Sequence, residues 1–180
     1  MFEQVIKLRI CIFFLVSVAF FSCSNDPELV RQFVEKKDFP IEIINGAEIL
    51  QTENGILKIK IVASNIKRFE DIQPNLLLSN GIEVTFYKDS AIRSVLNAEK
   101  AEIYESSNIM IASDNVVLVS SEGERMNTEE LIWDEKKNKI YTDKQIVITT
   151  DKEIIKGEGF ESNPDFSEYS IAKINGTFNL

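Results

Sequence analysis

The chain lacks histidine altogether, and its 180 residues include only two cysteines, Cys11 and Cys23. Without histidine, neither a Ser-His-Asp nor a Cys-His catalytic arrangement can form, and most zinc sites are excluded as well. Two cysteines, both close to the N-terminus, cannot build a disulfide framework. The composition therefore favours no enzyme class, and we expect neither a cofactor nor a metal site.

Basic residues are scarce relative to acidic ones: 20 Lys and Arg stand against 29 Asp and Glu, a formal net charge of −9. Such a surface repels phosphate backbones, which argues against nucleic-acid binding. An anionic ligand would have to be held through apolar surface or by a few local cations. Adjacent acidic residues such as Glu129-Glu130 are expected at turns or on polar faces, as solvated charge.

Residues 1–22 are predicted to be a lipoprotein signal peptide, because two basic residues precede an uncharged apolar run. The end of that run, Phe20-Phe21-Ser22-Cys23, resembles a bacterial lipobox, in which the cysteine is lipidated and becomes the new N-terminus. Residues 23–40 would then be the lipidated Cys23 and a linker. The alternative is an uncleaved anchor over Val5 to Phe21, at the lower length limit for a membrane span. Either way, we expect a domain outside the cytoplasm that is tethered to a membrane.

Residues 41–180 are expected to form an all-β domain of repeated antiparallel hairpins. Short apolar runs alternate with polar residues, and Asn, Asp or Gly follow each run. The stretch from Ser94 to Thr150 matches itself at a shift of 30 residues, and shifts of 35 and 29 extend the match to four units. Asn45-Gly46 is interpreted as a turn between two short strands.

One level of the four units is occupied by a small residue each time: Ala63, Ala98, Thr128 and Gly157. Two interpretations remain open. Either the sheet packs tightly at this level, or the small side chains leave room for facing side chains or for a ligand. Trp133 is the only tryptophan, and we expect it to anchor the core or a sheet face, with ligand contact as the alternative.

Seven motifs follow one another in residues 41–180. They are Asn80-Gly81-Ile82-Glu83-Val84-Thr85-Phe86-Tyr87-Lys88-Asp89, Leu96-x-Ala98-x-x-Ala101-x-x-Tyr104-x-x-x-Asn108, Asp114-Asn115-Val116-Val117-Leu118, Gly123-Glu124-x-Met126-x-Thr128-x-x-Leu131-x-Trp133-Asp134, Ile140-Tyr141-x-Asp143, Gly157-x-Gly159-Phe160-Glu161-Ser162 and Asp165-Phe166-x-x-Tyr169-x-Ile171. In this order they resemble the LptC family, the membrane-anchored periplasmic component of the lipopolysaccharide export machine. The resemblance implies a twisted antiparallel β-jellyroll that opens into a groove. The predicted lipobox departs from the transmembrane helix that many members carry.

The resemblance also implies a function. LptC proteins accept lipopolysaccharide from an inner-membrane ABC exporter that has its own periplasmic β-jellyroll, and pass it to the next, LptA-like jellyroll of a bridge to the outer membrane. The expected location is the periplasmic face of the inner membrane. A groove lined by aliphatic residues can shelter acyl chains while the sugars and phosphates stay in water.

Strand parity and repeat register give the candidate site residues. The lipid-binding groove is predicted to contain Ile59, Ile61, Ala63, Val84, Phe86, Leu96, Ala98, Val116, Leu118, Met126, Thr128, Ile146, Ile148, Ile155 and Gly157. The predicted docking edges are Ile41, Ile43 and Ile44, which would face the exporter, and Ile174, Thr177 and Phe178, which would pair with the next bridge protein.

Two other functions are compatible with the sequence. A structural or adhesive β-repeat lipoprotein would have a filled core and no lipid groove. A hydrolase would need two carboxylates that face each other across a cleft, and nothing in the sequence places any pair in that way. We therefore expect a non-catalytic transfer protein.

Overall fold

The computed structural model describes residues 39–179. The predicted signal peptide, the lipidation site at Cys23 and all but the last two residues of the predicted linker lie outside the described residues. Within residues 39–179, no helix is long and apolar enough to cross a membrane.

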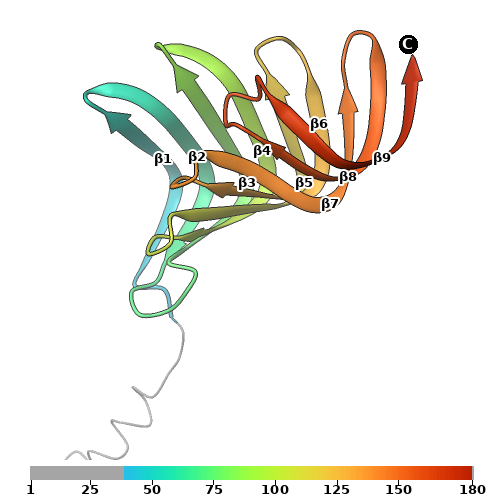
Figure 1. The fold of residues 1–180 in the computed structure, drawn as a ribbon. Helices are drawn as coiled ribbons and strands as arrows, with labels where there is room; N and C mark the ends of the chain where they lie inside the picture. The colour runs from blue at the N-terminus through green and yellow to red at the C-terminus, as the bar shows by residue number, and fades with distance from the viewer. Residues whose placement is uncertain (1–38, 180) are drawn as a thin grey trace, which may run out of the picture. The chain divides into compact units, whose positions relative to one another are not determined.

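In residues 39–179, nine antiparallel strands form a single sheet, in which each strand pairs with its neighbours in the chain, in the order β1 to β9 (Figure 1). The strands are β1 (Glu42–Glu53), β2 (Ile56–Arg68), β3 (Leu76–Lys88), β4 (Ala91–Tyr104), β5 (Ile109–Ser120), β6 (Arg125–Asp134), β7 (Lys139–Thr149), β8 (Glu153–Ser162) and β9 (Tyr169–Asn179). The prediction of an all-β fold built from repeated antiparallel hairpins is confirmed.

The strands are longer than the sequence suggested, because the predicted breaks between them are bends within them. The turn predicted at Asn45-Gly46 is wrong: both residues lie inside β1, where Gly46 has a φ of 65°. Asp114 and Asn115 likewise have positive φ in the middle of β5, beside a register shift against β6. Such β-bulges bend a strand without ending it.

The bulges lie side by side across the sheet, so that the sheet folds along one line, here called the crease (Figure 1). Two halves result. Wall A comprises residues 47–63, 82–98, 116–128 and 146–157, and wall B comprises residues 65–79, 100–113, 131–142 and 160–171. The apolar faces of both walls point inward and form one hydrophobic core.

The inward-facing residues follow a regular rule at the crease. In β2, β4, β6 and β8 the buried residues on its two sides are three positions apart: Ala63 and Ile66, Ala98 and Ala101, Thr128 and Leu131, Gly157 and Phe160. In β3, β5 and β7 they are four apart: Leu78 and Ile82, Ala112 and Val116, Thr142 and Ile146. The repeat in the sequence therefore reflects the same spacing of inward-facing residues each time the chain crosses the crease.

The small residues of the repeat have a packing role at the crease. In the cross-strand row they alternate with branched residues: Ala63 pairs with Ile82, which pairs with Ala98, and Thr128 pairs with Ile146, which pairs with Gly157. A Cβ on Gly157 would lie 2.6 Å from Cγ2 of Ile171, closer than packed carbon atoms approach. Two interpretations of the small residues were left open by the sequence. At Gly157, the interpretation of tight packing is therefore correct.

Candidate functional site

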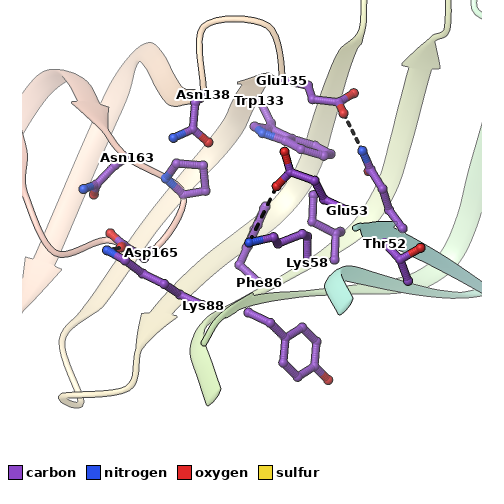
Figure 2. Close-up of a pocket in the computed structure, with 14 residues that line it drawn as sticks. Thr52, Glu53, Lys58, Phe86, Lys88, Trp133, Glu135, Asn138, Asn163 and Asp165 are labelled. Atoms are coloured by element: carbon purple, nitrogen blue, oxygen red, sulfur yellow. Dashed lines mark hydrogen bonds and ion pairs between the residues drawn. The ribbon is translucent and has the colours of Figure 1, made fainter. Parts of the chain in front are cut away.

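A cavity of about 660 Å³ lies between the two walls (Figure 2). Its apolar lining is Ile59 and Phe86 of wall A and Trp133 of wall B. The rings of Phe86 and Trp133 meet edge to face with their centroids 5.5 Å apart, so the walls touch at this point. We call this cavity the mouth. Its rim is formed by five charged side chains, those of Glu53, Lys58, Lys88, Glu135 and Asp165.

A smaller cavity of about 240 Å³, here called the cleft, adjoins the mouth. Three residues, Gln51, Trp133 and Glu135, line both. The remaining lining is mostly aliphatic, with Ile49 and Ile61 from wall A opposite Leu76, Ile103, Ile109 and Met110 from wall B. An apolar cleft that opens beneath a charged rim suits a molecule with an apolar and a polar end.

One hydrogen bond spans the rim. The side-chain amide of Gln51 on β1 donates to a carboxylate oxygen of Glu135, in the turn that follows β6 (Figure 2). Both side chains lie at the surface, where water competes for their polar atoms, so this hydrogen bond contributes little to stability.

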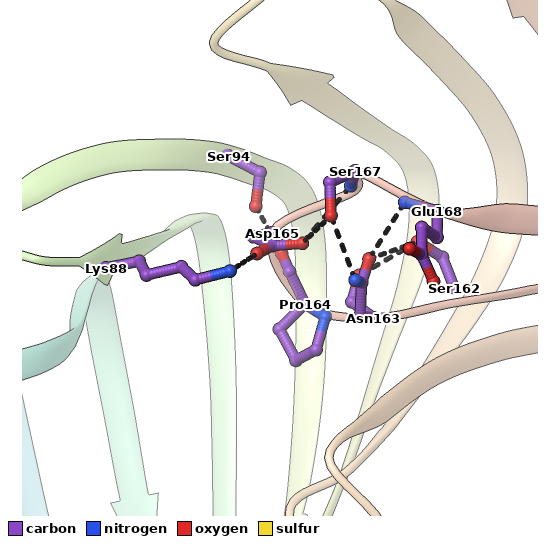
Figure 3. Close-up of polar contacts among 8 residues, drawn as sticks. All are labelled: Lys88, Ser94, Ser162, Asn163, Pro164, Asp165, Ser167 and Glu168. Carbon is purple, nitrogen blue, oxygen red and sulfur yellow. Dashed lines mark hydrogen bonds and ion pairs between the residues drawn. The ribbon is translucent and has the colours of Figure 1, made fainter.

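The loop of residues 163–168, between β8 and β9, crosses from wall B to the β3–β4 hairpin of wall A, and we call it the strap (Figure 3). The hydroxyl of Ser94 donates to the Pro164 carbonyl at 2.5 Å, and the Lys88 ammonium lies 2.9 Å from the Asp165 carboxylate. Phe166 is only 1% exposed and packs against Phe160 and Tyr169. The strap therefore joins the two walls through both polar and apolar contacts.

Asp165 is the electrostatic centre of the strap. Burial disfavours its charged form, but this effect is outweighed by hydrogen bonds from the Ser167 hydroxyl and amide and from Lys88, so its pKa lies below the usual range. The carboxylate is therefore more stable as an anion in the folded protein than in the unfolded chain. Asp165 contributes stability above its unfolded pKa, and that contribution is lost as the pH falls through the folded value.

Asp165→Asn should therefore lower the free energy of unfolding at neutral pH by about 1 kcal/mol, a modest value because Lys88 is screened by solvent. The difference between the variant and the wild type should shrink in strong acid, where the wild-type carboxyl is itself protonated. Urea unfolding at neutral and at strongly acidic pH measures this. Asp71→Asn, at an exposed position, is the control, and an equal effect of both substitutions would show that the strap contacts do not matter.

The fifteen residues predicted for the groove all lie on wall A and face the interior. Fourteen are buried, and Ile155 is half-buried. Three of them, Ile59, Ile61 and Phe86, line the mouth or the cleft. Ala63 and Ala98 instead line a separate hollow of about 460 Å³ at the crease. The other ten pack within the core.

The opposite wall was not predicted. The sequence interpretation assigned no groove residue to wall B, although Leu76, Ile103, Met110 and Trp133 supply most of the apolar surface of the cleft. A signal was available, because alternate residues continue to face inward beyond each bulge at the spacings of three and four given above. This spacing predicts wall B only if one already knows that the strands bend at Asn, Asp and Gly instead of ending there.

Five of the six residues predicted as docking edges lie on the two outermost strands. Ile43 and Ile44 on β1, and Ile174 and Phe178 on β9, are 38–62% exposed, and Thr177 is exposed as well. Ile41 precedes β1 and is 60% exposed. Among the residues that the structure describes, β1 pairs only with β2, and β9 only with β8. Each edge therefore offers backbone groups and apolar side chains to a partner.

The family model described as "Lipopolysaccharide-assembly, LptC-related" matches residues 8–172. The chain belongs to the LptC family. No curated protein matches it. Proteins of the LptC family are periplasmic, associated with the inner membrane and involved in lipopolysaccharide transport, and the open, twisted antiparallel sheet agrees with the LptC jellyroll. The part of the chain that the structure describes holds no cluster of three acidic or cysteine side chains that could ligate a metal.

Proposed function

We propose that this LptC-family protein binds the acyl chains of lipopolysaccharide between walls A and B and passes the lipid along a periplasmic bridge, without catalysing a reaction. The observation that carries the proposal is the apolar cleft beneath a charged rim, in a sheet whose two outermost strands each have one unpaired edge within residues 39–179. The lipid would arrive from an inner-membrane ABC exporter and leave to the next jellyroll of the bridge.

Apolar burial provides sufficient free energy for this role. Each CH₂ group removed from water contributes about 0.8 kcal/mol, so a few methylene groups of an acyl chain outweigh the weak polar contacts at the rim. No net positive charge is needed, which fits a chain with a formal charge of −9. The sugars and phosphates would stay in water, outside the mouth.

The two edges give the transfer a direction. We infer that the β1 edge faces the jellyroll of the exporter, because the predicted membrane tether precedes β1 in the chain. The β9 edge would then pair with the next, LptA-like jellyroll by β-augmentation. The tether itself would be the lipidated Cys23 at the periplasmic face of the inner membrane, or an uncleaved N-terminal anchor.

A structural or adhesive role is the second candidate, and the contact between Phe86 and Trp133 favours it. In that case the core is filled and the cleft is a packing defect without a ligand. Binding measurements on variants of the cleft separate the two functions.

Ile103→Asp should reduce lipopolysaccharide binding about tenfold or more, because it places a carboxylate in the cleft where an acyl chain would lie. Ile111→Asp is the matched control: Ile111 is also a half-buried isoleucine, but it follows the inward-facing Met110 and points to the outer face. Binding of labelled lipopolysaccharide to both variants measures the difference. Equal losses in both variants, or no binding by the wild type, would favour the structural role.

A further inference from the structure

Trp133 carries a hydrogen-bond donor that has no acceptor. Its side chain is 8% exposed, its indole nitrogen has no accessible surface, and no described residue accepts a hydrogen bond from it. Buried tryptophan N–H groups normally have a partner, because an unsatisfied buried donor is costly. This orphan donor therefore calls for an explanation.

The position of the donor points to a ligand. Trp133 is one of three residues that line both the mouth and the cleft. In Figure 2 the indole lies at the mouth with its nitrogen on the Asn138 side of the ring. Its ring is held by the edge-to-face contact with Phe86 and by backbone pairing of Trp133 with Met110 and Ile140. A fixed ring presents the donor at a fixed depth between the walls.

The other unsatisfied buried donor in the described residues, Nε of Arg93, provides a contrast. Arg93 lines neither the mouth nor the cleft, and its guanidinium group has further N–H groups that can reach water. Only the Trp133 donor stands where a ligand would pass.

Trp133 lies between two differently lined spaces. The residues that line only the mouth include the charged Glu53, Lys58, Lys88 and Asp165, whereas six of the eight that line only the cleft are aliphatic and one, Glu105, is charged. An acyl lipid has the same order: a polar head, then an ester or amide carbonyl, then a hydrocarbon chain. The carbonyl is the acceptor that lies at the boundary, and the hydrocarbon chain beyond it offers none.

We propose that the indole N–H of Trp133 donates a hydrogen bond to the ester or amide carbonyl of a bound acyl chain and so fixes how deeply the chain enters the cleft. This inference rests on the proposed function and adds a positioning residue to it. The nitrogen is enclosed in the structure, so a lipid that reaches it displaces the side chains that cover it at the mouth. Lipids that carry acyl carbonyls are then preferred over ether lipids of the same shape.

The test compares two lipids that differ in one carbonyl group: palmitoyl lysophosphatidylglycerol and its hexadecyl ether counterpart. The purified full chain should bind the ester about tenfold more tightly than the ether, as one hydrogen bond in an apolar site implies. Trp133→Phe keeps an aromatic ring and removes the donor, so it should abolish the preference, with the ester and the ether bound equally tightly whatever change in affinity the two lipids share. Calorimetric titration measures all four affinities.

A second measurement needs no variant. Because Trp133 is the only tryptophan, the isotope-labelled wild type gives a single indole N–H resonance, which should move downfield with the ester and not with the ether. Equal affinities for the two lipids and an unmoved resonance would overturn the role of Trp133 while leaving the proposed function standing. If the wild type binds neither lipid, both the inference and the proposed function are contradicted.

Discussion

Phe166→Ala is expected to lower the free energy of unfolding by about 3–5 kcal/mol, the usual cost of truncating a buried phenylalanine. Phe166 belongs to a loop, yet it is 1% exposed and packs against Phe160 and Tyr169, with ring centroids 5.7 and 5.3 Å away. Its removal leaves a cavity where the strap enters the core, and Pro164 and Asp165 lose the side chain that holds them near wall A. Urea unfolding followed by circular dichroism measures the change.

Phe178→Ala is the matched control for this experiment. Phe178 is a phenylalanine of β9 that is 56% exposed, with the Lys156 ammonium 5.5 Å above its ring. Its truncation should change the free energy of unfolding by less than about 1 kcal/mol. If the two alanine variants were equally stable, the strap would not be part of the core and the description of its contacts would be wrong.

The second large effect is expected at the sheet edges. Phe178→Asp combined with Ile174→Asp should weaken capture of the next bridge jellyroll by about a hundredfold or more, because two apolar anchors become charges at the contact. Capture of the exporter should be unaffected. Ile43→Asp should do the reverse, with loss of the exporter and normal capture of the bridge protein. Pull-down with each purified partner measures both losses.

Ile92→Asp controls for a general effect of charge on apolar surface. Ile92 is 52% exposed, close to the value for Phe178, but it lies on β4, which has a strand on either side. We expect normal capture of both partners by this variant. A loss of both partners with Ile43→Asp alone would contradict the assignment of one partner to each edge.

The sequence predicted the face of each residue better than the ends of the strands. Apolar and polar side chains alternate along a strand with a period of two, so the face of a residue can be predicted even when the end of its strand is placed wrongly. For this reason the fifteen predicted groove residues all face the interior of wall A. The exposed edges at Ile43 and Phe178 could also be predicted, since the first and last strands of a meander of hairpins have only one neighbour.

Wall B was missed although inward-facing residues continue beyond each bulge, because a residue that permits positive φ is compatible both with a turn and with a bulge. Gly46 and Asn115 look like the ends of strands in the sequence, and only their pairing with the neighbouring strands shows that β1 and β5 continue through them. The cleft was hidden for a related reason. It depends on which part of wall A faces Trp133, and no local pattern contains that information.

The strap was equally hidden. The sequence marks Asp165-Phe166-x-x-Tyr169 as a motif, but Phe166 stands in a polar loop with no periodic neighbours. Its neighbours Pro164 and Asp165 are bonded to Ser94 and Lys88, which lie 70 and 77 residues earlier in the chain. Contacts between residues this far apart in the chain depend on how the two walls face each other, which is a property of the whole sheet.

The central claim is that lipopolysaccharide lies between the two walls, and photo-crosslinking from adjacent residues tests it most directly. Leu76 and Ile61 face the cleft, whereas Leu77 and Val62 are their half-buried neighbours that do not line it. With a photoreactive residue at each position in turn and the export machine active, Leu76 and Ile61 should give lipopolysaccharide adducts, and Leu77 and Val62 should not. Equal labelling of the two faces would contradict a lipid path between walls A and B.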